Sequence, residues 1–159
     1  MRRFLIIGLG VVVLGWGTGT ARAQSEDPVK DLIALLKDRN VDVRRGASAA
    51  LGSQVDKEPA IPALIQALDD PDAEVRNNAV IALTLMFPRE VIPPLTKALK
   101  SPSANVRRGA ARVLGRMNRF TEPALPTLVL LLKDPDPAVR RTVAQTLRNI
   151  QGTVSPNAP

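Results

Sequence analysis

The chain has 159 residues and a net charge of +7, and its 45% apolar and 23% charged residues are an ordinary balance for one globular domain. It contains no His and no Cys, which removes the residues that most often act as general base, thiol nucleophile or transition-metal ligand near neutral pH. We therefore expect no enzyme: no catalytic residue, no metal and no cofactor.

The first 23 residues differ in composition from the rest. Arg2 and Arg3 precede an apolar run over residues 4–17, and Ala21-Arg22-Ala23 ends the segment. This order predicts a secretory signal peptide over residues 1–23, and hence export to a bacterial periplasm or out of the cell. The alternative is an uncleaved membrane anchor, although the apolar run is shorter than the roughly 20 residues that a membrane-spanning helix needs.

The charge is unevenly distributed along the chain. Removal of the leader would lower the net charge to +4, because it holds three arginines and no acid. Residues 24–83 hold 7 Lys and Arg against 11 Asp and Glu, whereas residues 84–159 hold 12 against 4. A basic C-terminal half predicts a preferred end for an acidic partner.

One pattern occurs four times after the leader. An apolar segment with the i, i+3, i+4 spacing of a helix is followed by a short polar turn, a Val-Arg pair and a second amphipathic segment. We name the two expected helices of each copy A and B. The valines are 32, 31 and 33 residues apart, a period that indicates stacked supersecondary units: Val43, Val75, Val106 and Val139.

Helix boundaries are marked by proline and by capping residues. Prolines stand at the expected entrances of the A helices, where a missing backbone N–H costs little. The turns end in strong N-cap residues for the B helices. We interpret Gly46 and Gly109 within the B helices as close-packing sites, because glycine otherwise costs about 1 kcal/mol there relative to Ala. The prolines are 28, 59, 62, 93, 94, 123 and 126, and the caps are Asn40, Asp72, Ser103 and Asp136.

This pattern resembles the HEAT repeat, in the compact bacterial form also seen in phycobilisome lyase subunits. The resemblance covers residues 28–151 and implies an all-α solenoid of four two-helix repeats in a right-handed stack. It implies little about activity, because the scaffold is shared by unrelated binding proteins. The Asp-Pro-Asp turn is complete only in repeats two and four, so repeats one and three should be looser. We expect a repeat domain over 24–151, with repeats near 28–54, 59–87, 90–119 and 122–151, and a disordered tail over 152–159.

The two arginines that follow each valine have different expected roles. The resemblance implies that the first reaches a turn acid of its own or an adjacent repeat, which makes a structural ladder of Arg44, Arg76, Arg107 and Arg140 with Asp72 and Asp136. The second falls on a stripe opposite the buried valine, at about 180–240° for 100° per residue. That stripe contains Arg45, Arg108, Arg112, Arg119, Arg141, Gln145 and Arg148.

The stripe can be interpreted in two ways. In stacked two-helix repeats the B helices line the concave surface, so these residues would form an arginine-rich groove. They can simply be solvated charges that keep an alanine-rich helix soluble. We hypothesise instead that the groove binds an acidic ligand, a segment of a protein.

An apolar residue stands out on the last A helix. At the equivalent position the four repeats have Ala34, Gln66, Lys97 and Leu130, and only the last is large and apolar. Either the tail or a bent helix covers Leu130, or it extends a patch for docking or self-association.

The sequence therefore predicts an exported, non-catalytic scaffold that binds a protein partner through its concave face. Two alternatives remain. One is non-specific binding to an anionic surface, nucleic acid or membrane. Export and an aromatic share of 3% argue against nucleic acid, and nothing predicts stable membrane insertion once the leader is removed. The other is a non-catalytic subunit of a lyase-type complex, which requires that the leader is not used. The oligomeric state is left open.

Overall fold

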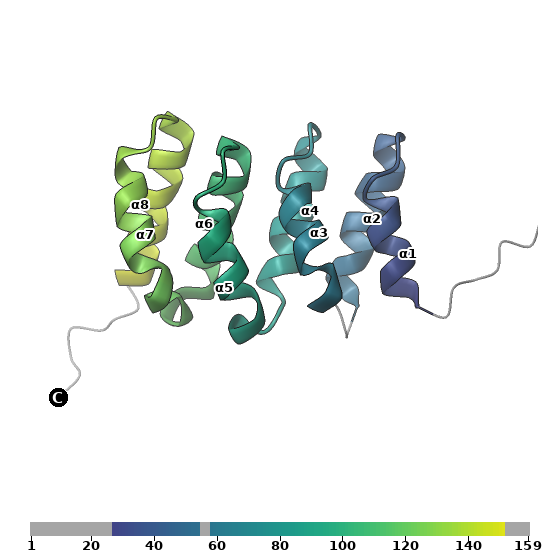
Figure 1. Ribbon diagram of the computed structural model, residues 1–159, viewed down its shortest axis with the longest axis horizontal. Coiled ribbons are helices and arrows are strands. Elements are labelled where there is room, and N and C mark those ends of the chain that lie inside the picture. Colours follow the sequence, from purple (N-terminus) through teal and green to yellow (C-terminus); the bar gives the residue numbers. More distant parts are fainter. Residues whose placement is uncertain (1–26, 55–57, 152–159) are drawn as a thin grey trace, which may run out of the picture.

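The computed structural model describes residues 27–54 and 58–151, and this part of the chain folds as a stack of four helix pairs without strands (Figure 1). The predicted all-α solenoid is thereby confirmed. The expected leader and tail lie outside the described residues. The pairs are α1 (Pro28–Leu35) with α2 (Val41–Ser53), α3 (Ile61–Ala67) with α4 (Ala73–Thr84), α5 (Pro88–Ala98) with α6 (Ala104–Met117), and α7 (Leu125–Leu130) with α8 (Pro137–Gln151).

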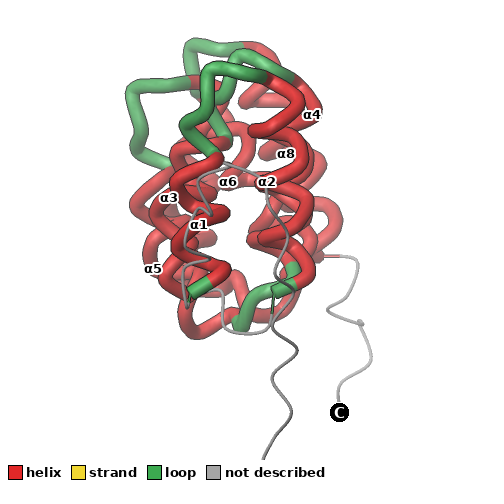
Figure 2. Tube along the Cα trace, turned by 90° about the vertical axis from the view of Figure 1, so that its right-hand side faces the viewer, coloured by secondary structure: helices red, strands yellow, loops and turns green. Residues whose placement is uncertain are grey.

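The helices form two layers. Viewed along the stack, the A helices α1, α3 and α5 lie on one side and the B helices α2, α4, α6 and α8 on the other (Figure 2). The B helices contact their neighbours in the stack more extensively than the A helices do. Within the described residues, no helix is both long enough and apolar enough to cross a membrane.

The four predicted N-caps of the B helices are confirmed. Asp72 Oδ1 accepts from the backbone N–H groups of Glu74 and Val75, both at 3.0 Å. Asp136 makes the same two bonds to the first turn of α8, and Asn40 and Ser103 make one bond each. Each cap satisfies backbone donors that would otherwise lack partners, a contribution of about 1 kcal/mol per helix.

The A helices are less regular than predicted. α5 begins at Pro88, so Pro93 and Pro94 lie inside the helix and not at its entrance. Both fall in the second turn, where they remove only the bonds that would reach the carbonyls of the first turn. α7 ends at Leu130 and tightens into the 3₁₀ segment η3 (Leu131–Lys133).

Small residues on the B helices allow close packing between neighbouring repeats. A Cβ on Gly109 would lie 2.8 Å from Cδ2 of Leu68, a side chain of the preceding repeat, so Gly109 is a close-packing site as predicted. The same is true of Gly115, where a Cβ would lie 2.7 Å from the Thr146 hydroxyl oxygen. Within the described residues the interpretation is wrong for Gly46, because no atom of another element lies within 4 Å of its Cβ position.

Candidate ligand-binding site on the B-helix face

The first arginine of two Val-Arg pairs joins consecutive repeats. Arg44 donates from Nε to Asp70 Oδ2 at 2.7 Å, and Arg107 donates in the same way to Asp134 Oδ2 at 2.7 Å. In both cases Nη1 also donates to two carbonyls of the arginine's own turn. Each arginine therefore ties its own turn to the first acid of the next turn.

The ladder acids are not the expected Asp72 and Asp136. These residues end their turns, and their Oδ1 atoms accept from the first backbone N–H groups of the B helices. The acids that bind these arginines are Asp70 and Asp134, the first residues of the Asp-Pro-Asp turns. The Arg107 guanidinium holds the pKa of the Asp134 carboxyl below its usual range, whereas the low pKa of Asp136 comes first from the Val139 and Ala138 backbone N–H groups.

Arg76 and Arg140 form no ion pair with any described residue. Nη1 of Arg76 donates to the carbonyls of its own turn at 2.6 and 2.7 Å, but repeat three has Ser101 where a ladder acid would stand. Arg140 likewise holds two carbonyls of its own turn, at 2.7 and 3.0 Å. The ladder is thus interrupted between repeats two and three.

Arg45, expected in the groove, is bound within the stack. Its Nη2 lies 2.7 Å from Asp72 Oδ2, its Nε lies 3.2 Å from Glu74 Oε2, and its Nη1 lies 3.4 Å from Asp42 Oδ1. The hydrogen bond to Asp72 is the main reason that the pKa of Arg45 is raised. With three acids around it, Arg45 is not available to a ligand, and we remove it from the candidate site.

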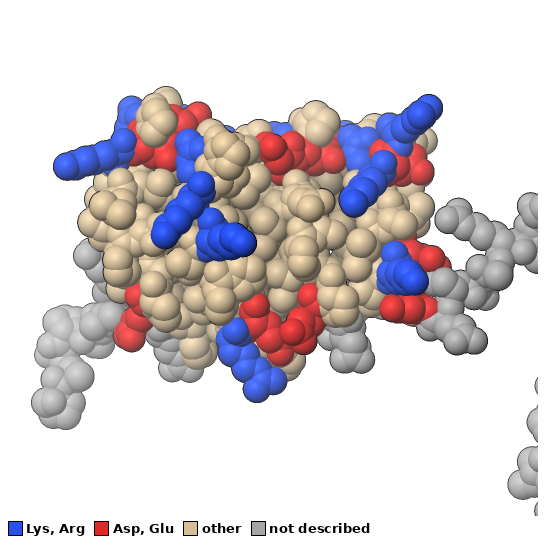
Figure 3. Space-filling view, in the orientation of Figure 1, with Lys and Arg blue, Asp and Glu red and all other residues tan. Residues whose placement is uncertain are grey.

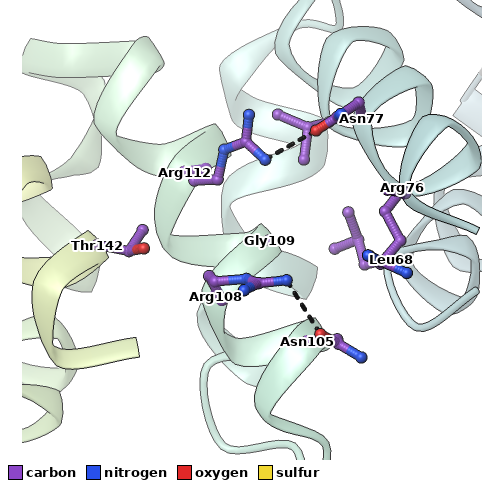
Figure 4. Close-up of a pocket in the computed structure, with 10 residues that line it drawn as sticks. Leu68, Arg76, Asn77, Asn105, Arg108, Gly109, Arg112 and Thr142 are labelled. Atoms are coloured by element: carbon purple, nitrogen blue, oxygen red, sulfur yellow. Dashed lines mark hydrogen bonds between the residues drawn. The ribbon is translucent and has the colours of Figure 1, made fainter. Parts of the chain in front are cut away.

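A cavity of about 350 Å³ lies between α4 and α6 (Figure 4). Arg76, Arg108, Arg112, Asn77 and Asn105 line it, and none of its lining residues is Asp or Glu. The two arginines of α6 point toward neutral amides: Arg112 Nη1 donates to Asn77 Oδ1 at 3.0 Å, and Arg108 Nη2 donates to Asn105 Oδ1 at 3.1 Å.

A second cavity of about 350 Å³ lies between α6 and α8. It is lined by Arg112, Arg116 and Arg141 together with Gln145 and Asn149, again without Asp or Glu. Since Arg112 lines both cavities, they form one continuous basic surface. We call this surface, defined by Arg108, Arg112, Arg116 and Arg141, the arginine groove.

The arginines of the groove repel one another. The pKa of Arg112 is lowered, first by burial of its guanidinium and then by the positive charges of Arg116 and Arg108. Asp136, at the start of α8, is close enough for Arg108 to contribute to its low pKa, but the two side chains form no ion pair, and Asp136 Oδ1 accepts from two backbone N–H groups. An anion in the groove would offset this repulsion.

The other predicted groove residues are placed differently. α6 ends at Met117, and Asn118 has a φ of 55° that turns the chain, so Arg119 belongs to the 3₁₀ segment η2 (Asn118–Ala124) and not to the α6 stripe. The Arg119 side chain lies outside the part of the chain that the structure describes. Arg148 is exposed on α8, donates to Gln145 Oε1 at 2.6 Å and lines neither cavity.

Sequence reasoning missed Arg116. It lies ten residues after Val106, at about 280° on the helix, which is beyond the edge of the predicted stripe. A wider stripe would have included it.

The opposite, A-helix face of the molecule differs from the groove: its charged side chains gather mainly along the loop edges, and much of its middle is uncharged (Figure 3). No group of three or more Asp and Glu in the described part of the chain could hold a metal ion.

Fold and groove together define a two-helix repeat solenoid with a basic surface on its B layer. A family model for HEAT repeats matches residues 2–84 and 92–158, and the chain belongs to this family. The resemblance noted from the sequence is thereby confirmed.

Two kinds of relative accompany this match. Phycocyanobilin lyase subunit alpha from a Picosynechococcus species is 37% identical over 84 residues, which are 48% of this chain but only 31% of the relative. The complex of CpcE and CpcF of phycocyanin lyase from a Nostoc species has the same fold, with a TM-score of 0.59, 24% identity and 79% of each chain covered. A designed armadillo repeat protein in complex with the peptide (KR)4 has a TM-score of 0.47 and 22% identity over 77% of this chain and 64% of its own.

Proposed function

We propose that this chain is a non-catalytic scaffold that binds an acidic segment of a protein partner in the arginine groove. The observation that carries the proposal is the environment of Arg108 and Arg112, whose hydrogen-bond partners are two neutral amides although both line a cavity. A guanidinium forms its strongest hydrogen bonds with a carboxylate, often two at once. A carboxylate would therefore displace the asparagine contacts with a gain in binding energy.

The two cavities suit an extended segment that crosses the B helices. Neighbouring packed helices lie about 8–10 Å apart, and a chain in the polyproline II conformation has three residues per turn and rises about 3.1 Å per residue. Acidic residues three positions apart would therefore reach the α4–α6 cavity and the α6–α8 cavity at the same time. Solenoid repeat proteins bind by extended surfaces of this kind.

The same proposal includes export of the chain. It is supported by the order of basic, apolar and small residues over 1–23. Amino-terminal sequencing of the protein purified from its native cells should begin at Gln24, and an intact Met1 would contradict export.

A second candidate is a non-catalytic subunit of a lyase-type complex. It is favoured by the relative that is 37% identical over 84 residues and by the shared fold of a two-protein lyase complex. Under this alternative the chain is not exported and its groove faces a partner subunit. Amino-terminal sequencing therefore also separates the two candidates.

The groove can be tested with labelled peptides. One peptide carries glutamates at every third position in an otherwise neutral sequence, and its control carries glutamines there. Fluorescence anisotropy should show binding of the glutamate peptide, weakened by salt because the contacts are ionic. The double variant Arg108→Glu/Arg112→Glu should lose this binding.

The matched control is Arg89→Glu/Lys100→Glu, which changes the net charge equally at exposed positions outside the groove. It should retain the affinity of the wild type. Equal losses in both double variants would mean that only net charge matters, and equal binding of both peptides would contradict recognition of acid. Duplex DNA or anionic vesicles that bind more tightly than the peptide would favour a non-specific anionic surface instead.

A further inference from the structure

Inside the stack, two kinds of contact join consecutive repeats. The leucine that ends an A helix packs over the B helix of the next repeat, as Leu68 does over Gly109, which stands three residues after Val106. The first arginine of a Val-Arg pair binds the first acid of the next turn, as Arg107 binds Asp134 at 2.7 Å. Leu68 over Gly109 joins repeats two and three, where the described residues form no ion pair of this kind. Arg107 with Asp134 joins repeats three and four, where the equivalent leucine, Leu99, is also buried.

At the C-terminal end of the stack, the leucine and the arginine of this junction have no partner among the described residues. Leu132 is 41% exposed, whereas the equivalent Leu68 and Leu99 are 1% and 0% exposed. Arg140 is exposed and pairs with no acid in the described ranges. Leu130, singled out from the sequence, is 73% exposed next to them, and the tail that was one candidate to cover it lies outside the described residues.

The N-terminal end of the stack presents the positions that would receive these two contacts, an acid for the arginine and a glycine for the leucine. Asp38 occupies the position of the ladder acids Asp70 and Asp134, and its Oδ1 accepts the same turn N–H, from Asn40 at 2.7 Å. No described arginine forms an ion pair with it. Gly46 occupies the position of Gly109, but no described residue of another element lies within 4 Å of its Cβ position.

Nothing within the described residues of one copy accounts for Gly46. A glycine in the middle of a helix costs about 1 kcal/mol relative to Ala, and at Gly109 that cost is offset by the close approach of Leu68. At Gly46 the same space is empty. A leucine arriving from outside, at the angle that Leu68 takes, would fill it.

We propose that the chain stacks head to tail on a second copy of itself, with Leu132 packed over Gly46 of the next copy and Arg140 paired with Asp38 of that copy. The charge distribution supports this occupant, because residues 24–83 are net acidic and residues 84–159 are net basic. The arrangement continues the spacing of the repeats from one molecule into the next. It is independent of ligand binding in the arginine groove.

Such a contact is heterologous, since two different surfaces meet. Each added copy leaves one free end of each kind, so association continues as an open series and does not stop at a dimer. Sedimentation velocity should therefore show average mass rising continuously with concentration, and rising less at high salt. A single species at monomer mass up to millimolar concentration would overturn the proposal, and so would a closed symmetric dimer.

Two single variants test the ionic half. Arg140→Asp and Asp38→Arg should each weaken association about tenfold, because each places like charges at the junction. An equimolar mixture of the two variants restores opposite charges at both kinds of junction, so association should return to near the wild-type level. A mixture that remains monomeric would contradict the pairing of these two positions.

Gly46→Gln tests the apolar half without disturbing the fold. The position has open space and glutamine is a better helix former, so thermal stability should be unchanged or raised while association falls about tenfold. Arg89→Glu, exposed on α5, serves as the control and should associate like the wild type. Undiminished association in Gly46→Gln would place the contact elsewhere.

Discussion

Arg107 and Asp134 form a two-bonded ion pair between the third and fourth repeats, with Nε–Oδ2 at 2.7 Å and Nη2–Oδ1 at 2.8 Å. Both side chains are nearly inaccessible to water. Loss of one partner from such a pair leaves the other charge buried without compensation, which is more costly than loss of an exposed pair.

The variant Asp134→Asn should therefore lower the free energy of unfolding by roughly 3 kcal/mol, measured by urea denaturation. Glu122→Gln removes an exposed carboxylate and should change stability by less than about 0.5 kcal/mol. Similar small effects for both would show that the ladder pair does not stabilise the stack.

The interrupted junction between repeats two and three offers the reverse experiment. Ser101 Oγ accepts from the Ser103 backbone N–H at 3.2 Å, as a ladder acid does, and Arg76 already holds its own turn. Ser101→Asp should complete the ladder and raise the free energy of unfolding by about 1 kcal/mol. Because the gain depends on the arginine, it should vanish in an Arg76→Gln background, and a gain that persists there would rule out the pair.

Acid should weaken the stack. The pKa values of Asp72, Asp134 and Asp136 are lowered in the folded chain, the first two mainly by arginine hydrogen bonds and the third by backbone N–H groups. Since the folded values lie below the usual 3.8, the stabilisation is complete above that pH and is lost as pH falls through the folded values.

Urea denaturation should therefore give a nearly constant stability between about pH 5 and 7 and a steep decline below about pH 4. Asp134→Asn should show a shallower decline, because it lacks one of the carboxyls concerned. A decline of the same steepness in wild type and variant would assign the acid sensitivity to other groups.

The fold was predictable because its signals are local. Asn40, Asp72, Ser103 and Asp136 each cap the helix that follows directly, and a cap requires only the next few residues. The end of α6 was less predictable, because Asn118 turns the chain without a glycine or proline to announce it. That displaced Arg119 from the expected stripe.

The candidate site was predictable only in part, because it depends on side chains of adjacent repeats. Arg45 and Arg108 occupy the same position in their repeats, yet Arg45 binds Asp72 and Glu74 while Arg108 binds Asn105. Helical angles place both arginines on one face. Helical angles do not predict which acids of a neighbouring repeat reach that face. The position of those acids decides which arginine has its charge neutralised by a carboxylate.

Glycine-to-alanine substitutions at two equivalent positions should have opposite effects. At Gly109 the new Cβ would lie 2.8 Å from Cδ2 of the buried Leu68, so overpacking should exceed the gain in helix propensity and lower stability by about 1 kcal/mol. At Gly46 the space is open, so alanine should raise stability by about 1 kcal/mol. Thermal unfolding at low protein concentration, where copies are separate, measures both. A gain at both positions would mean that Leu68 can move aside and that repeats two and three are packed less tightly than the distances indicate.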